Sequence, residues 1–168
     1  MSLEQLFVEL FRSIPHWLAT IMISALPFSE LRGAIPIAVG VYGMDPLVVY
    51  FLVVIGNMIP VIPLLLYLDP LSTYLRRFKV GDAFFSWLFT RTHRKHSERF
   101  ERYGTLALTI FVAIPLPMTG AWTGCVAAFV FGIRFKHALM AISSGVLIAG
   151  MIVTTVTLLG LGAFNLAI

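Results

Sequence analysis

Two residues in this chain have the types and spacing for chemistry at depth in an apolar environment: the acid Glu30 and the base Arg32. From Ser13 to Leu68 the only other charged residue is Asp45. A charge at the centre of a bilayer costs roughly 2.5–3.5 kcal/mol on insertion scales, so such a pair needs mutual pairing, a water-filled cavity or a ligand. The planar donor fork of arginine suits phosphate or carboxylate. A carboxylate balanced between burial and a nearby cation suits a proton carrier.

The stretch around these charges is predicted to be a broken helix over residues 27–36. Two prolines and Gly33 stand in it, with the sequence PFSELRGAIP. Proline removes a backbone donor, and glycine adopts backbone angles that other residues avoid. Helix N-termini at such a break add partial positive charge for an anion. The alternative is a short loop outside the membrane in which Glu30 and Arg32 merely pair.

The composition indicates an all-α integral membrane protein with a single membrane domain over residues 1–168. Hydrophobic residues make up 59% and charged residues 12% of the 168 positions, whereas soluble domains are about 25% charged. About 20 apolar residues cross a bilayer, so we expect four to six membrane segments. Cys125 is predicted to be a packing residue. We expect no metal site, because His93 and His96 have no suitable third ligand nearby except Glu98. We also expect no cofactor and no nucleic-acid partner.

Two stretches are predicted to span the membrane. The first runs over residues 47–68 after Asp45-Pro46, a helix start with Asp as N-cap and Pro at the first helical position. We expect Asp69-Pro70 to end it. The second runs over residues 138–162. The residues predicted to interrupt the first span are Gly56, Asn57, Pro60 and Pro63. The amide of Asn57 either bonds across helices or lines a site.

Basic residues gather in the linker, residues 69–104, which holds 8 of the 12 lysines and arginines. By the positive-inside rule this linker is cytoplasmic, and we expect the membrane to be the plasma (inner) membrane of a prokaryote. Aromatic residues interleave with the charges, which favours amphipathic helices resting on anionic headgroups. The alternative is a funnel that draws an anionic substrate inward. Residues 3–13 predict a further amphipathic helix at the interface.

The two halves of the chain, residues 15–68 and 105–168, match in outline. A second break falls at residues 115–124, flanked by apolar arms 105–114 and 125–133. We align Gly33-Ala34 with Gly120-Ala121. Thirteen residues separate Gly43 from Gly56, and thirteen also separate Gly132 from Gly145. The charge topology orients the halves oppositely, so the sequence predicts an inverted repeat of two re-entrant helical hairpins, each followed by a transmembrane helix, as in many secondary transporters.

Hairpin tips that meet near the midplane would bring Glu30 and Arg32 close to Thr119, Trp122 and Thr123. The alternative for these last three is helix packing, with hydroxyls bonded to their own backbone. The predicted substrate- or ion-binding residues are Glu30, Arg32, Gly33, Asn57, Pro115, Pro117, Thr119, Gly120, Trp122 and Thr123.

Three motifs carry a resemblance: SELRGAIPIAVG at 29–40, GNMIP at 56–60 and IPLPMTGAWTG at 114–124. Over about residues 25–162 the chain resembles the small multidrug export protein family. More distantly its architecture resembles the DedA (VTT-domain) superfamily, whose members are implicated in moving polyprenyl-phosphate and other lipids between leaflets. The resemblance implies that the family's glutamate and arginine are Glu30 and Arg32. It places the second tip on Pro115, Pro117, Thr119, Gly120, Trp122 and Gly124. Met118 stands where the family pattern predicts glycine, which would make this tip stiffer or narrower.

These features predict a transporter or lipid flippase and not an enzyme. It would be coupled to protons or another ion, and would move an anionic amphipathic substrate such as a lipid-linked phosphate. The alternatives are a small multidrug exporter for cationic amphipathic compounds and an ion channel with Glu30 and Arg32 at its constriction. An intramembrane enzyme would need further ionisable residues at depth. The expected partners are membrane lipids, a lipid or small-molecule substrate and, because the spans are rich in glycine, a second copy of the chain.

Overall fold

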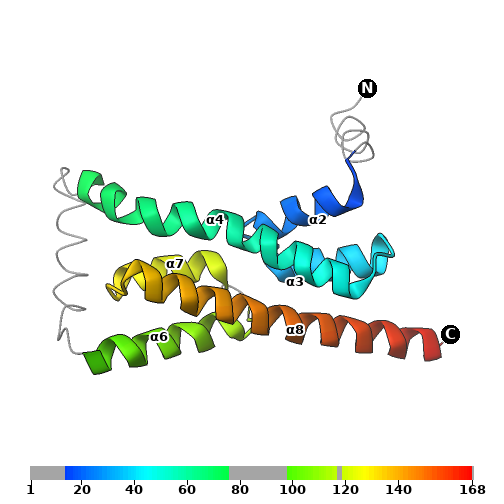
Figure 1. Cartoon of the computed structure of the whole chain (residues 1–168). Coiled ribbons are helices and arrows are strands. Elements are labelled where there is room, and N and C mark those ends of the chain that lie inside the picture. The colour runs from blue at the N-terminus through cyan, green and yellow to red at the C-terminus, as the bar shows by residue number, and fades with distance from the viewer. Residues whose placement is uncertain (1–13, 76–97, 117–118, 168) are drawn as a thin grey trace. The chain divides into compact units, whose positions relative to one another are not determined.

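The computed structural model describes residues 14–75, 98–116 and 119–167, and every element in these ranges is helical (Figure 1). The elements are α2 (His16–Ala25), α3 (Glu30–Pro36), the π-helix η1 (Ile37–Val41), α4 (Pro46–Leu75), α6 (Glu98–Ala113), α7 (Ala121–Val130) and α8 (Phe135–Ala167). The predicted all-α class is therefore confirmed. The amphipathic helix predicted at 3–13, the His93–His96 pair and most of the basic linker lie outside the described residues.

The chain forms two compact units. The first consists of residues 1–57 and 150–168, and the second of residues 58–149. The first unit contains α2, α3, η1, the first part of α4 and the last part of α8. The second contains α6, α7 and the remaining parts of α4 and α8. Each unit thus combines one pair of short helices with parts of both long helices.

The predicted start of the first span is confirmed. The side chain of Asp45 caps α4, with its Oδ1 accepting hydrogen bonds from the backbone N–H groups of Leu47 at 2.9 Å and Val48 at 3.2 Å. The predicted interruptions at positions 56, 57, 60 and 63 and the predicted end at Asp69-Pro70 are wrong, because α4 runs without a break to Leu75. A proline removes one backbone bond, and a long helix with intact turns on both sides tolerates that loss.

Two helices are long and apolar enough to cross a bilayer: Pro46–Leu68 in α4, with 23 residues, and Phe135–Ala163 in α8, with 29. Of the most apolar stretch in each, only 28% and 17%, respectively, is buried within the protein. The core helix of a soluble protein would be mostly buried. The exposed apolar residues of α4 recur at helical spacing, at Val48, Phe51, Ile55, Ile59, Ile62 and Leu66. These surfaces indicate a membrane protein.

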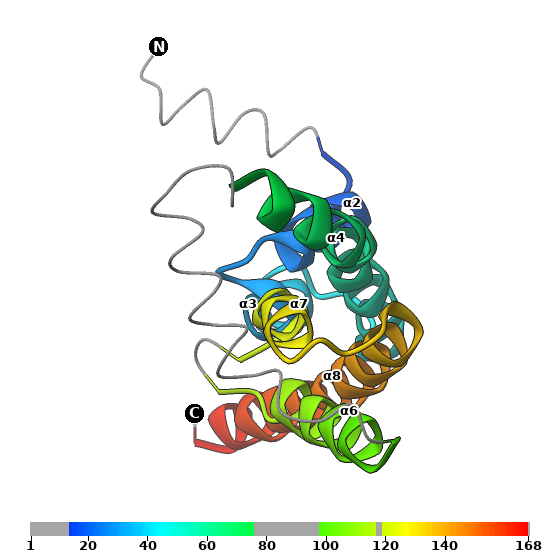
Figure 2. The same cartoon turned by 90° about the vertical axis from the view of Figure 1, so that its left-hand side faces the viewer.

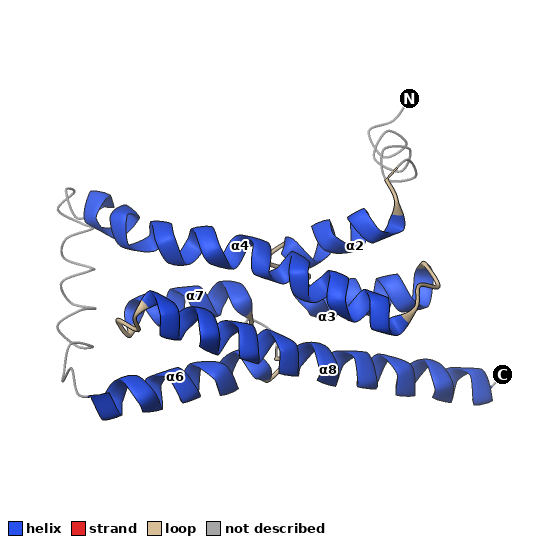
Figure 3. Ribbon diagram, in the orientation of Figure 1, coloured by secondary structure: helices blue, strands red, loops and turns tan. Residues whose placement is uncertain are grey.

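Both pairs of short helices have a helix–break–helix form, with α2 packed against α3 and α6 against α7 (Figure 3). The first break is shorter than predicted, because residues 30–36 are helical and the loop covers only residues 26–29. In the second pair α6 begins at Glu98 and α7 at Ala121, ahead of the predicted arms. Pro36 lies in α3 directly before η1, and residues 122–124 lie in α7. Proline and glycine therefore mark the regions of both breaks but not their ends.

Corresponding stretches in the two units are buried in the same pattern. Residues 30–38 and 120–128 have the same order of buried, half-buried and exposed positions. The buried residues Val49, Val53, Gly56, Asn57 and Val61 of α4 likewise correspond to Ala138, Ile142, Gly145, Val146 and Gly150 of α8, 89 positions further on. The helices α3 and α7 correspond at a spacing of 90 positions. This register pairs Gly33 with Thr123 and so corrects the alignment of Gly33-Ala34 with Gly120-Ala121.

The spacing is 90 positions between α3 and α7 but 89 between α4 and α8. The turns before the long helices explain this difference of one position. In the second unit Gly132, with φ +63°, closes a Schellman turn in which the N–H of Ile133 donates to the Ala128 carbonyl at 2.9 Å. In the first unit Gly43 also has φ +63°, but the N–H of Met44 donates to Ala38, one residue further back, at 3.0 Å. The π-helical turn η1 accommodates this extra residue.

Alanine at Gly43 or Gly132 should destabilise the fold by about 1 kcal/mol, because side chains disfavour the left-handed backbone region. Thermal unfolding of the purified chain in lipid nanodiscs would measure this loss. Gly160→Ala is the matched control, since a Cβ there meets nothing within 4 Å and the helical backbone accepts alanine. Equal losses in all three variants would contradict the role assigned to the two turns.

Candidate functional site at the α2–α3 break

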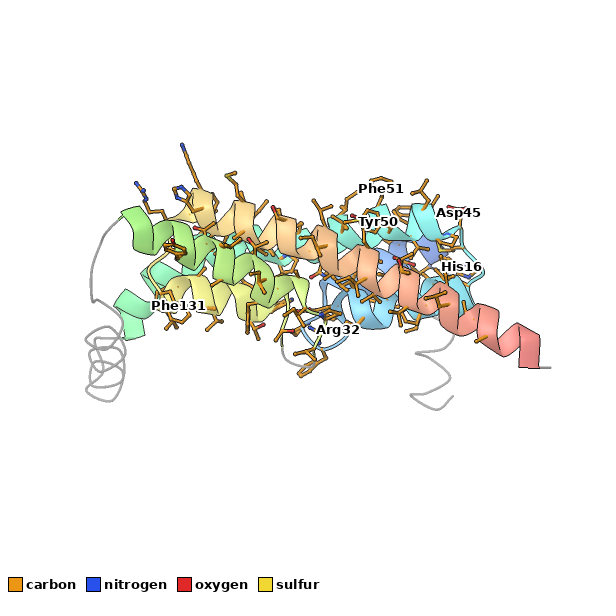
Figure 4. The ribbon with its side chains drawn as sticks, turned by 90° about the horizontal axis from the view of Figure 1, so that it is seen from below. His16, Arg32, Asp45, Tyr50, Phe51 and Phe131 are labelled. Atoms are coloured by element: carbon orange, nitrogen blue, oxygen red, sulfur yellow. The ribbon has the colours of Figure 1, made fainter. Side chains whose placement is uncertain are left out.

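The charge pair lies at the start of α3. The Arg32 Nη2 and the Glu30 Oε2 are 3.8 Å apart. The Glu30 side chain is 8% exposed and that of Arg32 is 27% exposed. Figure 4 shows Arg32 at the break, away from His16 at the opposite end of α2. The pair therefore has an inner carboxylate and a more accessible guanidinium.

Glu30 has a backbone conformation that is rare for a residue with a side chain. Its φ is +44°, in the left-handed region, which disfavours residues other than glycine, asparagine and aspartate. Neighbouring bonds hold the backbone there. The Glu30 N–H donates to the Leu26 carbonyl at 3.0 Å, and the Ser29 hydroxyl donates to the Ile23 carbonyl at 2.7 Å. Strain at one residue, held by its surroundings, is typical of functional sites.

Gly33 is needed for close packing within the turn. A Cβ at Gly33 would lie 2.8 Å from the Cβ of Ser29. The Gly33 N–H donates to the Ser29 carbonyl at 2.8 Å. The lack of a side chain at Gly33 therefore lets the first turn of α3 close beside the charge pair. That Gly33 takes part in binding stays a prediction.

Asn57 is fully buried, and both polar atoms of its side chain, Oδ1 and Nδ2, lack a hydrogen-bond partner in the described part of the chain. Of the two alternatives for Asn57, the bond to another helix is therefore absent among these residues. The preceding residue, Gly56, lies where α4 meets α2. A Cβ at Gly56 would be 2.6 Å from the Ile21 carbonyl oxygen and would overlap the Ser24 hydroxyl. Asn57 thus lies in the part of α4 that is beside the C-terminal end of α2.

At the second break, hydroxyls bind their own backbone. The Thr119 hydroxyl donates to the Ile114 carbonyl at 2.7 Å and accepts from the Leu116 N–H at 3.1 Å. The Thr123 hydroxyl lies 3.3 Å from the Gly120 carbonyl. This is the packing alternative raised for these threonines. The other candidate positions there are Pro115 and Trp122, both half-buried, the buried Gly120, and Pro117, which lies outside the described residues together with Met118.

The candidate residues fall into two groups. Glu30, Arg32, Gly33 and Asn57 belong to the first unit, and Pro115, Pro117, Thr119, Gly120, Trp122 and Thr123 to the second. That both groups serve one site stays a prediction. Sequence reasoning missed Ser24, which is fully buried beside Gly56. The sequence signal that could have identified Ser24 is a polar residue close to the end of an apolar helix. Across the described ranges no three His, Cys, Asp or Glu side chains are grouped to hold a metal ion.

Two apolar helices of spanning length, with a partly buried charge pair at a helix break, indicate a helical membrane protein. The family model described as "Putative small multi-drug export protein" matches residues 30–152, more than half of the chain. The chain belongs to this family, and the family's description supports a transporter as the class of protein. No curated protein and no solved structure matches the chain. The comparisons give no support for the more distant likeness to the DedA superfamily.

Proposed function

We propose that the chain is an ion-coupled membrane transporter in which the α2–α3 break binds an anionic amphipathic substrate. The observation that carries this proposal is the charge pair at the break, where a buried carboxylate lies 3.8 Å from a guanidinium, next to a strongly apolar helix. Charges at such positions are costly and mark substrate or ion pathways in membrane proteins.

The accessibility of the two partners supports an anionic substrate. The Arg32 side chain retains 27% of its exposure and that of Glu30 only 8%. An approaching ligand therefore meets the guanidinium first. A guanidinium binds phosphate or carboxylate oxygens through paired hydrogen bonds. Glu30, behind it, would exchange its ion pair for a proton when the substrate phosphate binds Arg32. A lipid-linked phosphate combines the required anion with an apolar tail.

An inverted repeat of re-entrant hairpins is the architecture that we propose for this transporter. The common burial pattern of residues 30–38 and 120–128, and of α4 and α8, supports a repeat. The basic residues of the linker and those that follow the second hairpin, Arg134 and Lys136, support opposite orientations of the halves. Short apolar helices of 10 residues, α2 and α7, are too short to cross a bilayer and suit re-entrant segments.

Export of cationic amphipathic compounds is the second candidate. The description of the family favours it. The buried carboxylate of Glu30 is the group that would bind such a cation, with Arg32 moving away. The two candidates require opposite partners of the pair to bind the substrate, so variants of the two residues distinguish them.

The test is transport by the full chain in proteoliposomes across a series of pH values, with a fluorescent polyprenyl-phosphate analogue and, separately, ethidium. Arg32→Ala is expected to lower movement of the phosphate about 100-fold or more, because a charge-assisted bidentate contact is lost. Glu30→Gln is expected to remove the pH dependence. Arg134→Ala, which removes an exposed arginine at the start of α8, is the matched control and should transport normally.

Three outcomes decide between the candidates. If Arg32→Ala loses phosphate movement and the other variants keep it, the result supports the anion proposal. Movement of ethidium that fails in Glu30→Gln, with no movement of the phosphate by the natural chain, supports the second candidate. Normal transport of either probe in both variants overturns the assignment of the site.

A further inference from the structure

The buried polar residues of this protein are distributed unevenly between its two units. The described chain has four buried polar or charged residues, Thr20, Ser24, Glu30 and Asn57, and all belong to the first unit. The Thr20 hydroxyl is bonded to the His16 carbonyl in its own helix, at 2.7 Å. The remaining three, Ser24, Glu30 and Asn57, form a set that we name the polar centre.

The second unit has the same packing positions without these polar groups. The register between the units pairs Glu30 with Gly120 and Asn57 with Val146, and all four are buried. Equal burial is thus reached with apolar or small residues. Burying polar groups without full pairing is unfavourable. Packing therefore does not require a polar group at Glu30 or Asn57, which points to a role in binding.

The members of the polar centre lie at one level of the first unit. Ser24 is the second-last residue of α2, and it lies directly against Gly56, the residue before Asn57. Glu30 follows the same end of α2, where its N–H bonds to the Leu26 carbonyl at 3.0 Å. Figure 2 shows α2 beside α4. The three residues therefore lie near the end of α2, beside the α2–α3 break.

The hydrogen-bonding capacity of the polar centre selects its ligand. Asn57 offers an acceptor, Oδ1, and a donor, Nδ2, and neither has a partner among the described residues. A metal cation would bind Oδ1 and leave Nδ2 unpaired. A water molecule donates to Oδ1 and accepts from Nδ2, and its second hydrogen suits an ionised carboxylate, which only accepts. The Ser24 hydroxyl donates to the Ile21 carbonyl at 2.9 Å. It can accept the second hydrogen of the water in place of the carboxylate when Glu30 is protonated.

Building on the proposed ion coupling, we propose that Asn57 and Ser24 hold a water molecule at the break and that this water carries the coupling proton to and from Glu30. In the forward step an O–H bond of the protonated water breaks, and the proton forms a new O–H bond to a carboxylate oxygen of Glu30. This leaves neutral water and a neutral carboxylic acid. The reverse step returns the proton and restores the ion pair with Arg32. The proton, and not a metal cation, is then the coupling ion.

Few other charged groups surround Glu30 on the elements that form this region. On α3 itself the charged neighbour is Arg32, 3.8 Å away. The helix α2, which packs against α3, has one titratable residue, His16, at its opposite end. The adjoining η1 has none. The stretch of α4 over 46–68 has no charged residue, and its titratable side chains are Tyr50 and Tyr67. The last part of α8, residues 150–167, has no charged residue either. Among these elements the charged neighbour of Glu30 is therefore Arg32, and the proposed water supplies the route for the proton.

Infrared difference spectroscopy of the full chain in lipid bilayers tests this proposal without a transported substrate. The C=O stretch of protonated Glu30 is assigned as the band that Glu30→Gln removes. In Asn57→Val, which introduces the residue found at the corresponding position 146, we expect this band to shift in frequency. Its hydrogen–deuterium exchange should also slow about 100-fold, the scale of a positioned proton-transfer partner. Ser24→Ala should give a smaller shift in the same direction.

Thr109→Ala is the matched control, because its hydroxyl bonds within α6, to the Thr105 carbonyl. An unchanged Glu30 band and exchange rate in both Asn57→Val and Ser24→Ala would overturn the proposal. The Glu30 band could instead shift with Na⁺ but not with K⁺, and lose this shift in Asn57→Val. That result would overturn the proposal in favour of a cation site. If Asn57→Val fails to fold, Ser24→Ala decides. The proposed function fails separately, if Glu30→Gln still transports with normal pH dependence.

Discussion

The variant Gly56→Val is expected to destabilise the first unit strongly. We expect its effect to be larger than that of valine at any other glycine that packs between the helices of this unit. A Cβ at Gly56 would lie 2.6 Å from the Ile21 carbonyl oxygen and 3.1 Å from the Ile21 Cα, and would overlap the Ser24 hydroxyl. Two of these atoms are backbone, so a rotamer change cannot relieve the contact. We expect a loss of about 3 kcal/mol or more in the free energy of unfolding, the upper end of the range for overpacked cores. Thermal unfolding in nanodiscs would measure it.

A graded series of glycine variants provides the controls. Gly145→Val should be nearly as severe, because a Cβ there would lie 2.6 Å from Val112 Cβ and 2.9 Å from the Thr109 carbonyl oxygen. Gly150→Val should be milder, since the nearest atom, at 2.9 Å, is on the movable ring of Tyr50. Gly160→Val should be tolerated, because nothing lies within 4 Å. Equal stability of Gly56→Val and Gly160→Val would contradict the close contact between α2 and α4 at Gly56.

Adding Ser24→Ala to Gly56→Ala separates the two sources of overlap. The serine substitution removes the hydroxyl but leaves the Ile21 carbonyl in place. We therefore expect partial rescue, with the effects of the two substitutions departing from additivity, as neighbouring residues do. Full rescue would mean that the Ser24 hydroxyl alone limits the approach of the helices.

The sequence predicted the features of the fold that depend on local chemistry. Asp45-Pro46 starts a helix wherever it occurs before an apolar run, because the carboxylate caps exposed N–H groups and proline fits the first turn. The two spans were predicted from the length of two stretches without charged residues. Proline and glycine indicated both helix breaks. The pairing of Glu30 with Arg32 was one of three ways to accommodate charges at depth, and the structure places the two side chains 3.8 Å apart.

The features that depend on packing could not be predicted. The prolines of α4 do not end it, because a helix continues wherever its remaining bonds and contacts compensate for a missing donor. The alignment of Gly33 with Gly120 differs from the structural register by three positions, because it matched glycines by identity, and the burial that reveals the register is a property of packing. The matched glycine spacings also do not reveal the extra residue that η1 accommodates. Ser24 was missed since its importance arises from Gly56, distant in sequence and adjacent in space.

The largest electrostatic effect is expected for Arg32→Ala. It leaves the carboxylate of Glu30, 8% exposed, without its counter-charge. Breaking a buried pair by removing one partner costs about 3–5 kcal/mol. We expect the lower end of this range, because the Arg32 side chain is 27% exposed and water reaches it. Glu30→Gln should cost less, about 1 kcal/mol, since it leaves the more accessible partner alone and retains a polar group of similar shape. Unfolding of the purified variants in nanodiscs would measure both losses.

The double variant Glu30→Gln/Arg32→Ala tests the cause of this loss. If the cost of Arg32→Ala comes from an unpaired buried charge, neutralising Glu30 should recover most of it, and the double variant should be more stable than Arg32→Ala alone. The recovery should change little with added salt, because ions do not screen buried pairs effectively. Additive losses that shrink in high salt would instead describe a solvated ion pair in a loop, the alternative that the sequence left open. The asymmetry between the two single variants is therefore the sharpest test of whether this break holds its charges inside the protein, and it does not depend on the substrate.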